Sequence, residues 1–442
     1  NSMRVTIVGT GYVGLVTGCC LGDAGHDVIC VDNNRAKVAE MKRGQSPIFE
    51  PGLAEMMKSN IEHGRLSFTT DLSKAVSIAE AIFLALPTPP QDDGSADLSA
   101  VISVAKQLGK IMPQSYCVVI NKSTVPVGTA EAVKQAISAS AKTDFDVVSN
   151  PEFLREGHAV QDFMEPERVV IGVSSKKAEA VMTKLYEAFV DYDRPLYVTD
   201  TATAELAKYA ANTFLVTKVS FMNEMANLAE FMNADIDMLR QIIGSDSRIG
   251  HKFLHPGIGC GGSCFPKDIR ALDHMAKQHD YDFKLLTSAI AVNNQQQRLL
   301  VNKLSDHFNG DLKGKIFTLW GLAFKPHTDD IREAPALTII DELVKAGAKV
   351  KAYDPEAADN VRAIYKDNKS VEILDDKYDV LKDSEALIVA TEWPEFIESD
   401  LTQIKALLQK PVVFYCRNIW HNPQMKKAGF SYYSVGRRPV VQ

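Results

Sequence analysis

The chain has 442 residues, 45% of them hydrophobic and 24% charged, which is enough apolar material for two or three cores. Its net charge of -7 gives no basic excess, so a nucleic-acid partner is not expected. The apolar runs are strand-length, far below the roughly 20 residues that a membrane span needs. The cysteines lack C-x-x-C spacing, which argues against a metal site or a disulfide framework. Without a signal-peptide pattern, a cytoplasmic protein is expected.

The first 200 residues alternate short apolar segments with helical patterns. Residues 4–8 predict a strand, residues 14–24 a helix and residues 27–31 a second strand. Further strands are expected at 81–86, 117–121, 147–149 and 169–172. This strand and helix alternation predicts an α/β fold with a parallel, doubly wound sheet.

Residues 200–232 then form a proline-free helical segment with apolar or small residues on more than one face, as expected of a helix buried between domains or against another subunit. A second alternation begins at 315–319, with a helix over 336–346, Gly347 at its end, and strands at 349–353, 386–390 and 412–415. We therefore predict two Rossmann-like domains, over 1–200 and 311–442, joined by a long central helix in a helical domain over 201–310.

A glycine-rich turn, Gly9-Thr10-Gly11-Tyr12-Val13-Gly14, connects the first strand to the first helix, and Asp32 ends the second strand. The glycines let the backbone approach a pyrophosphate at the helix N-terminus. Asp32 can accept hydrogen bonds from ribose hydroxyls and repel a 2′-phosphate, which favours NAD over NADP. A tight turn without a ligand is the alternative interpretation. Lys37 fits a cofactor contact or a solvated helix face equally well.

A second concentrated motif spans residues 253–268, where several glycines allow the backbone to approach a ligand closely. Pro266 can start a helix through 269–277, which places Cys264 just before a positive helix end and near Lys267. Both features favour a reactive thiolate over a merely buried thiol. The buried interpretation is preferred for Cys19, Cys20, Cys30 and Cys117, while Cys260 stays undecided.

A hydride acceptor and a nucleophilic cysteine together suggest a particular sequence of reactions. Hydride removal from an alcohol gives an aldehyde, and the thiolate adds to it to form a thiohemiacetal. A second hydride loss gives a thioester, which water cleaves to the acid. The residues thus predict a four-electron oxidation carried out in two steps at one site.

Five stretches spread along the chain closely resemble the UDP-glucose/GDP-mannose dehydrogenase family, and in particular its UDP-glucose dehydrogenases. They are the glycine turn, Lys122–Pro126, Asn150–Gly157, Ala204–Asn212 and Gly261–Asp268. The resemblance runs nearly end to end. It implies an NAD-binding domain, a central dimerisation domain and a UDP-binding domain, in a homodimer that oxidises UDP-glucose to UDP-glucuronate with NAD through a thioester on Cys264.

The resemblance also implies roles for single residues. Cys264 would be the nucleophile, and Lys208 and Asn212, four apart on one helix, would stabilise the oxyanion. Water and protons would be handled by Thr124, Glu152 and Asp268. Considered without the family, Lys208 could reach solvent along an apolar helix, Asp268 could be an ordinary first-turn acid, and Glu152 could be a surface residue.

The cofactor residues implied by the family are Gly9, Gly11, Tyr12, Val13, Gly14, Asp32, Lys37, Thr88, Thr124, Glu152, Lys267 and Arg332. The substrate residues implied are Glu152, Phe153, Leu154, Arg155, Glu156, Lys208, Asn212, Arg248, Phe253, Leu254, His255, Pro256, Gly257, Gly261 and Lys325. Lys325 would supply the positive charge that the UDP diphosphate needs. Its loop lacks the dinucleotide glycine pattern, so UDP is expected there rather than a dinucleotide. Arg248 resembles a residue that the family donates to the neighbouring subunit. Cys260 departs from the family, which commonly has an aromatic residue there.

Three other functions remain open at this point. The nearest is a dehydrogenase of GDP-mannose or of a UDP-N-acetylhexosamine that uses the same mechanism. A two-electron hydroxyacid-type dehydrogenase would share the Rossmann domain but would need no thiol. A catalytically silent NAD-binding sensor would need neither Cys264 nor its pairing with Lys208 and Asn212, so the presence of all three argues against it.

Overall fold

The computed structural model describes residues 2–262 and 264–442, and the chain divides into two compact units. The first unit comprises Asn1–Ala211 and Arg270–Asp280, and the second comprises Asn212–Ile269 and Tyr281–Gln442. Two helices have residues in both units: α9 (Thr201–Met232) and α11 (Phe265–Gln278). No helix in the described ranges is long and apolar enough to cross a membrane.

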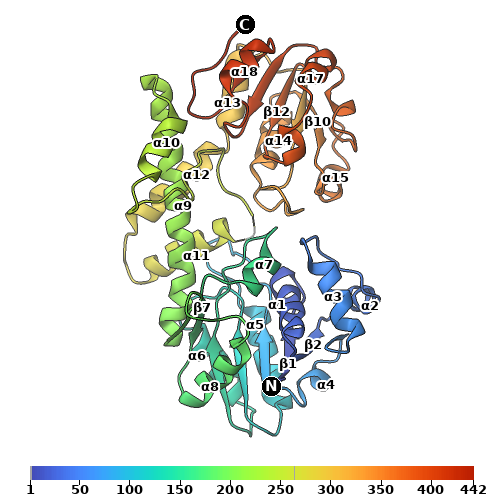
Figure 1. Ribbon diagram of the computed structural model, residues 1–442, viewed down its shortest axis with the longest axis vertical. Coiled ribbons are helices and arrows are strands. Elements are labelled where there is room, and N and C mark those ends of the chain that lie inside the picture. Colours follow the sequence, from blue (N-terminus) through green and yellow to red (C-terminus); the bar gives the residue numbers. More distant parts are fainter. Residues whose placement is uncertain (1, 263) are drawn as a thin grey trace. The chain divides into compact units, whose positions relative to one another are not determined.

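An eight-stranded sheet forms the centre of the first unit, in the order β3-β2-β1-β4-β5-β6-β7-β8 (Figure 1). Its strands are β1 (Arg4–Val8), β2 (Asp27–Val31), β3 (Leu66–Thr69), β4 (Ala81–Leu84), β5 (Cys117–Asn121), β6 (Phe145–Ser149), β7 (Val169–Gly172) and β8 (Leu196–Thr199). Neighbouring strands are parallel except β6 and β7, which pair antiparallel through Ser149 and Gly172. Since β1, β4 and β5 lie inside the sheet, they are buried almost throughout, as expected for strands covered on both faces.

Helices cover this sheet on both sides and create two separate cores. The helices are α1 (Tyr12–Asp23), α2 (Arg35–Lys42), α3 (Leu53–Glu62), α4 (Leu72–Val76), α5 (Ser99–Ile111), α6 (Thr129–Ser138), α7 (Ala159–Met164) and α8 (Lys176–Tyr186). Side chains of α1, α3, α7 and α8 share one core with Val118, Ile120 and Val148. Those of α4, α5 and α6 share the other with Val119 and Val147. Adjacent strand residues thus alternate between the two cores.

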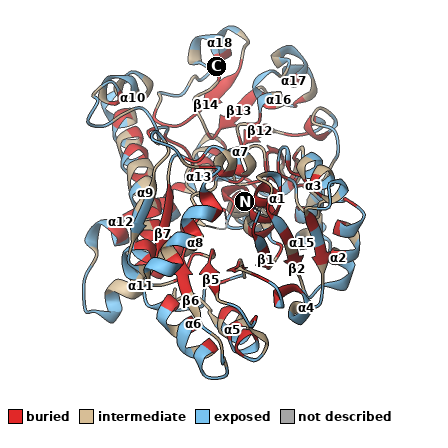
Figure 2. Cartoon of the chain, turned by 60° about the horizontal axis from the view of Figure 1, so that its bottom comes forward, coloured by how far each residue is buried: buried red, intermediate tan, exposed pale blue. Residues whose placement is uncertain are grey.

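The second unit contains a six-stranded, wholly parallel sheet in the order β11-β10-β9-β12-β13-β14. Its strands are β9 (Ile316–Trp320), β10 (Lys349–Tyr353), β11 (Val371–Ile373), β12 (Ala386–Val389), β13 (Val412–Tyr415) and β14 (Ser431–Tyr433). The remaining helices are α10 (Ile236–Gly244), α12 (Lys284–Gln296), α13 (Leu299–His307), α14 (Pro335–Lys345), α15 (Ala358–Tyr365), η1 (Asp379–Leu381), α16 (Pro394–Ile397), α17 (Leu401–Leu407) and α18 (Asn422–Lys427). Figure 2 shows the strands mostly buried, while the helices carry exposed faces.

The predicted α/β alternation and the long helix are confirmed. Helix α9 starts and ends within one residue of the predicted range, and α1 starts at Tyr12, two residues earlier than predicted. Several short strands were not predicted, among them β3 and β8. Only alternate residues of β3 are buried and none of β8 is, so the apolar run that marks a central strand is missing.

Candidate active site

The glycine turn after β1 is packed so closely that side chains are excluded from it. A Cβ at Gly9, where φ is 105°, would lie 2.1 Å from the Ala85 carbonyl oxygen, and one at Gly14 would lie 2.0 Å from the Gly9 oxygen. Gly11 faces open space, with no atom within 4 Å of the Cβ position. Gly11 is also the N-cap residue of α1, and it makes no side-chain hydrogen bond to the helix end. The turn therefore offers an uncovered helix N-terminus to an anion such as the pyrophosphate of NAD.

Asp32 stands directly after β2 as a half-buried carboxylate. It accepts hydrogen bonds from Thr10 Oγ1 at 2.5 Å and from the Asn34 amide at 2.9 Å, and Lys37 Nζ lies at 3.4 Å. Burial alone would raise the pKa of Asp32, but these hydrogen bonds and the Lys37 charge hold it below its usual value. An ionised acid at this position suits the ribose hydroxyls of NAD. Lys37 thus has a partner in the protein itself.

Glu152 and Lys208 form a buried ion pair in the first unit, with Oε1 and Nζ 3.6 Å apart and side chains only 3% and 4% exposed. Glu152 also accepts a hydrogen bond from the Leu154 amide at 2.6 Å. The Phe153 ring lies 5.3 Å from Lys208 Nζ and 3.8 Å from the Arg168 guanidinium. The surface interpretation of Glu152 and the snorkelling interpretation of Lys208 are therefore wrong. Charged groups this deeply buried are typical of functional sites.

Thr124 lies in the loop between β5 and α6. Hydrogen bonds with side chains of other segments fix both ends of this loop. Its carbonyl accepts a hydrogen bond from Thr88 Oγ1 at 3.1 Å. At the other end, Glu205 of α9 accepts hydrogen bonds from the Gly128 and Ala130 amides at 3.2 and 3.0 Å and so caps α6. Burial raises the pKa of Glu205 to about 7, although these amides oppose the shift. Sequence reasoning missed Glu205, although it lies three residues before Lys208 on the same helix.

In the second unit, Asn212 donates from Nδ2 to Asp268 Oδ2 at 2.8 Å, and both side chains are buried. Asp268 belongs to the first turn of α11, and its amide donates to the Cys264 carbonyl at 2.8 Å. Cys264 thus immediately precedes the helix and is partly exposed. On α9, Lys208 precedes Asn212 by one helical turn.

Side-chain amides fix the loop before Cys264. Asn293 accepts from the Cys260 amide at 2.6 Å and donates to its carbonyl at 3.1 Å, so it holds both backbone groups of this residue. For Gly257, Gln296 donates to the carbonyl and Asn223 accepts from the amide, each at 2.8 Å. Burial raises the pKa of Cys260 to about 11, which makes this thiol a poor nucleophile. Sequence reasoning missed these amides because their partners are more than 30 residues away.

The same loop packs against the segment that follows β9. A Cβ at Gly261 would lie 2.4 Å from the Glu333 oxygen, and the Gly262 amide donates to the Arg332 carbonyl at 2.7 Å. Arg332 also pairs with Asp330 at 2.6 Å. Ser263 lies outside the described residues. The cofactor candidate Arg332 and the substrate candidate Gly261 are therefore neighbours within the second unit.

Two arginines among the candidates form ion pairs with acids that are not site candidates. Arg155 pairs with Asp162 at 2.8 Å, and Arg248, whose side chain is 87% exposed, pairs with Asp246 at 2.7 Å. Two further loop residues, His255 and Pro256, accept hydrogen bonds from Arg417 through their carbonyls, at 3.0 and 2.9 Å. The first unit holds the candidates Gly9, Gly11, Tyr12, Val13, Gly14, Asp32, Lys37, Thr88, Thr124, Glu152–Glu156 and Lys208. The second holds Asn212, Arg248, Phe253–Gly257, Gly261, Cys264, Lys267, Asp268, Lys325 and Arg332.

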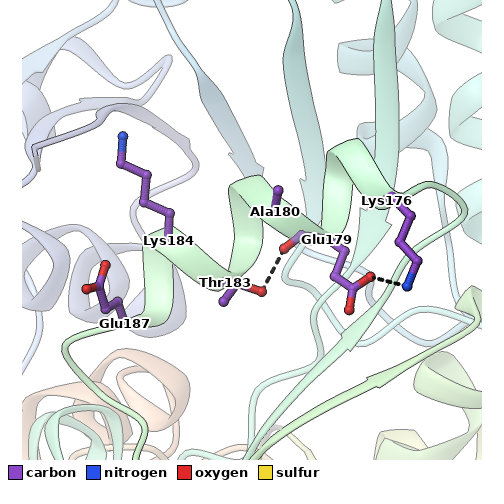
Figure 3. Close-up of a pocket in the computed structure, with 6 residues that line it drawn as sticks. All are labelled: Lys176, Glu179, Ala180, Thr183, Lys184 and Glu187. Atoms are coloured by element: carbon purple, nitrogen blue, oxygen red, sulfur yellow. Dashed lines mark hydrogen bonds and ion pairs between the residues drawn. The ribbon is translucent and has the colours of Figure 1, made fainter.

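A surface hollow along α8 is unrelated to these residues. Figure 3 shows six side chains from this helix and its end, with Lys176 paired to Glu179 and Thr183 bonded to the Glu179 carbonyl. The other three are Ala180, Lys184 and Glu187. None of the six is a predicted site residue, and we assign no function to this hollow.

Comparison with known proteins identifies the family. The NAD binding domain of the UDP-glucose/GDP-mannose dehydrogenase family matches residues 3–190, its central domain matches residues 202–295, and its UDP binding domain matches residues 318–422. The chain belongs to the UDP-glucose/GDP-mannose dehydrogenase family. It is accordingly an NAD-dependent nucleotide-sugar dehydrogenase, and the predicted resemblance is confirmed.

Individual relatives resemble the chain over nearly its whole length. It is 44% identical to the UDP-glucose 6-dehydrogenase of Rhizobium meliloti (strain 1021), over 98% of this chain and 100% of that protein. It is also 44% identical to UDP-glucose 6-dehydrogenase TuaD of Bacillus subtilis (strain 168), over 99% and 94%. The structure of a UDP-glucose dehydrogenase from the hyperthermophilic archaeon Pyrobaculum islandicum matches with a TM-score of 0.92 at 35% identity, over 99% and 98%.

Proposed function

We propose that this dehydrogenase oxidises UDP-glucose to UDP-glucuronate in two steps, with a thioester on Cys264 as the second covalent intermediate. The proposal is carried by one observation: Cys264 precedes α11 and is connected, through Asp268 and Asn212, to the helix that bears the buried Lys208. The relatives named UDP-glucose 6-dehydrogenase support the choice of substrate.

The cofactor site suits NAD. We assign its pyrophosphate to the start of α1, formed by Gly11, Tyr12 and Val13, because the N-cap residue Gly11 makes no side-chain cap. Asp32, held as a carboxylate, would accept from the ribose hydroxyls. NAD, when bound, supplies the hydride acceptor for each oxidation. The other proposed contacts are Gly9, Gly14, Lys37, Thr88, Thr124, Glu152, Lys267 and Arg332.

Residues of the protein would carry out the remaining chemistry. The Cys264 thiolate adds to the aldehyde carbon, and the resulting oxyanion is stabilised by Lys208 and Asn212. After the second oxidation, water attacks the acyl carbon, the carbon–sulfur bond breaks, and the acid leaves while the thiolate is restored. Protons of the alcohol and of this water pass to groups among Thr124, Glu152 and Asp268.

The substrate contacts are proposed from the resemblance to the family. The proposed contacts are Glu152–Glu156, Lys208, Asn212, Phe253–Gly257, Gly261 and Lys325, and Arg248 is proposed to reach a second subunit. The diphosphate requires fixed positive charge, which Lys325 would supply. We further propose the domain limits 1–200, 201–310 and 311–442, while a cytoplasmic location stays a prediction.

We propose a homodimer built on α9. Phe214, Phe221 and Leu228 recur every seven residues, hence near one face of the helix, and are 66%, 57% and 43% exposed. A second copy of this helix would cover them. Light scattering should give a dimer for the wild type and a monomer for Phe221→Glu. A wild type that remains monomeric at working concentrations would contradict the proposal.

The substrate is tested by following NADH absorbance with a panel of nucleotide sugars. UDP-glucose should yield two NADH for each sugar consumed, since the alcohol is oxidised fully to the acid. The structure of a UDP-D-ManNAc dehydrogenase from Pyrococcus horikoshii matches this chain with a TM-score of 0.85 at 26% identity, so the panel should include its sugar and GDP-mannose. Turnover of only one of these competitors would overturn the assignment to UDP-glucose.

A further inference from the structure

A third charged side chain, Lys122, is buried in the first unit and is bonded to Asn150, two residues before Glu152. It follows β5 directly and is only 4% exposed. Its Nζ donates to Asn150 Oδ1 at 3.2 Å and to the Tyr186 hydroxyl at 3.4 Å. The rings of Phe163 and Tyr186 lie 5.6 and 5.8 Å from it. Within the described residues no carboxylate forms an ion pair with Lys122, so its hydrogen-bond partners are neutral.

The neighbours of Lys122 are fixed independently of it. Asn150 donates from Nδ2 to the Val170 carbonyl at 2.9 Å, which orients its Oδ1 toward Lys122. The same oxygen also accepts a hydrogen bond from the Tyr186 hydroxyl. If Lys122 were an apolar residue, Asn150 would keep both partners. The network therefore does not need this lysine to satisfy its polar groups.

Burying a cation without an ion-pair partner destabilises a fold. Burial, with a contribution from the charge of Lys208, lowers the pKa of Lys122 to about 8, and the charge of Glu152 opposes the shift. Lys122 is thus still mostly an ammonium at neutral pH. The ionisable groups that act on it are Tyr186 on α8, through a hydrogen bond, and Glu152 after β6 and Lys208 on α9, through their charges. Burial raises the pKa of Tyr186, which keeps that hydroxyl neutral.

We propose that Lys122 is a positioning residue whose buried ammonium attracts the Glu152 carboxylate, repels the Lys208 ammonium, and so sets how this pair holds its protons during oxidation. A buried ammonium in addition to this pair favours a developing oxyanion. Lys122 acts through Glu152 and Lys208, and its role rests on the functions proposed above for these two residues.

The test uses Lys122→Met, which keeps the length and removes the charge, and Tyr186→Phe, which removes a hydroxyl from the same network and keeps the charge. In Lys122→Met, kcat should fall by roughly tenfold to a hundredfold with little change in KM. Its kcat profile should move to higher pH, because Glu152 and Lys208 would both hold their protons more tightly. Tyr186→Phe should retain the wild-type profile and most of kcat.

Thermal unfolding of the protein without ligands supplies a readout besides activity. The cost of burying the Lys122 charge is fully present below pH 8 and disappears as the pH rises toward the ordinary lysine value. Lys122→Met should therefore have an equal or higher Tm than the wild type at pH 7, and this advantage should shrink between pH 8 and pH 10. A merely structural lysine would instead lower Tm when replaced.

An unchanged kcat profile in Lys122→Met, or an equal loss of kcat in Tyr186→Phe, would overturn the proposal. So would a lower Tm of Lys122→Met at pH 7 together with a parallel loss of activity. Wild-type protein that reduces no NAD with any nucleotide sugar would instead refute the proposed function, and this role with it. Activity of the wild type alone therefore separates the two failures.

Discussion

The two sheets of this chain begin in the same way but use their acidic residues differently. In each, a glycine with positive φ directly follows the first strand, Gly9 or Gly321, and an aspartate follows the second strand, Asp32 or Asp354. Asp32 accepts hydrogen bonds from one backbone amide and from side chains. The Asp354 carboxylate accepts from four backbone amides, those of Leu322, Ala323, Glu356 and Ala357.

The turns differ as well. Helix α1 starts at Tyr12, directly after the glycine turn, whereas α14 starts only at Pro335, well after Gly321. A helix N-terminus therefore meets the turn only in the first sheet. The Asp354 carboxylate fixes its own turn through backbone amides, whereas Asp32, which makes fewer backbone contacts, is the proposed acceptor for a ribose. The comparison teaches that a strand, a glycine and an acid specify a cofactor site only when the helix and the carboxylate remain accessible.

The largest effect is expected from the second unit, where the proposed nucleophile lies. Cys264→Ser should reduce acid formation by about 10⁴-fold or more, because a hydroxyl is a far weaker nucleophile than a thiolate at neutral pH. NAD should still bind, since the glycine turn belongs to the first unit. Acid production is measured by chromatography and NAD binding by calorimetry. Unimpaired acid formation would reject the covalent route.

The next largest effect is expected for Asp354→Ala. It should lower the free energy of unfolding by roughly 3 kcal/mol, because buried backbone amides lose their acceptor. All three tryptophans, Trp320, Trp393 and Trp420, lie in the second unit, so urea unfolding followed by their fluorescence reports on that unit. Asp32→Ala is the matched control and should leave this transition nearly unchanged. Equal unfolding midpoints in the two variants would contradict the contrast between the acids.

The sequence predicted the α/β fold, the long helix and the cysteine loop because these depend on local patterns of apolar residues, glycine and proline. It could not predict that Glu152 and Lys208 pair, or that Asn212 bonds to Asp268, since these partners are 56 residues apart. Lys122 was visible only as part of a family motif. Its burial depends on Asn150 and Tyr186, which the fold brings to it from other elements.

Removing the charge of Asp32 should have a smaller effect, which is limited to cofactor binding. Asp32→Asn should weaken NAD binding by about tenfold, or roughly 1.4 kcal/mol, because the ribose hydroxyls lose a charged acceptor. Binding of NADP should weaken less or improve, since repulsion of the 2′-phosphate is removed. Titration calorimetry with both cofactors measures this, with Asp354→Asn as the control. An identical loss for NAD and NADP would argue against ribose recognition by Asp32.

Lys37→Met should have the smallest effect and decides between two roles for this lysine. Its side chain is 25% exposed and pairs with Asp32 at 3.4 Å, an interaction worth less than about 1 kcal/mol. If Lys37 only pairs with Asp32 and does not contact the cofactor, NAD affinity should change by less than about threefold. A loss as large as that in Asp32→Asn would assign Lys37 a direct contact with the cofactor.

The covalent chemistry of Cys264 is tested most directly by mass spectrometry of acid-quenched reactions. Asp268→Asn and Glu152→Gln, which should slow hydrolysis, are mixed with UDP-glucose and NAD and then digested. We predict a nucleotide-sugar adduct on the peptide that contains Cys264, absent in Cys264→Ser and without NAD. NADH formation with no adduct on this peptide in either variant would contradict the thioester route.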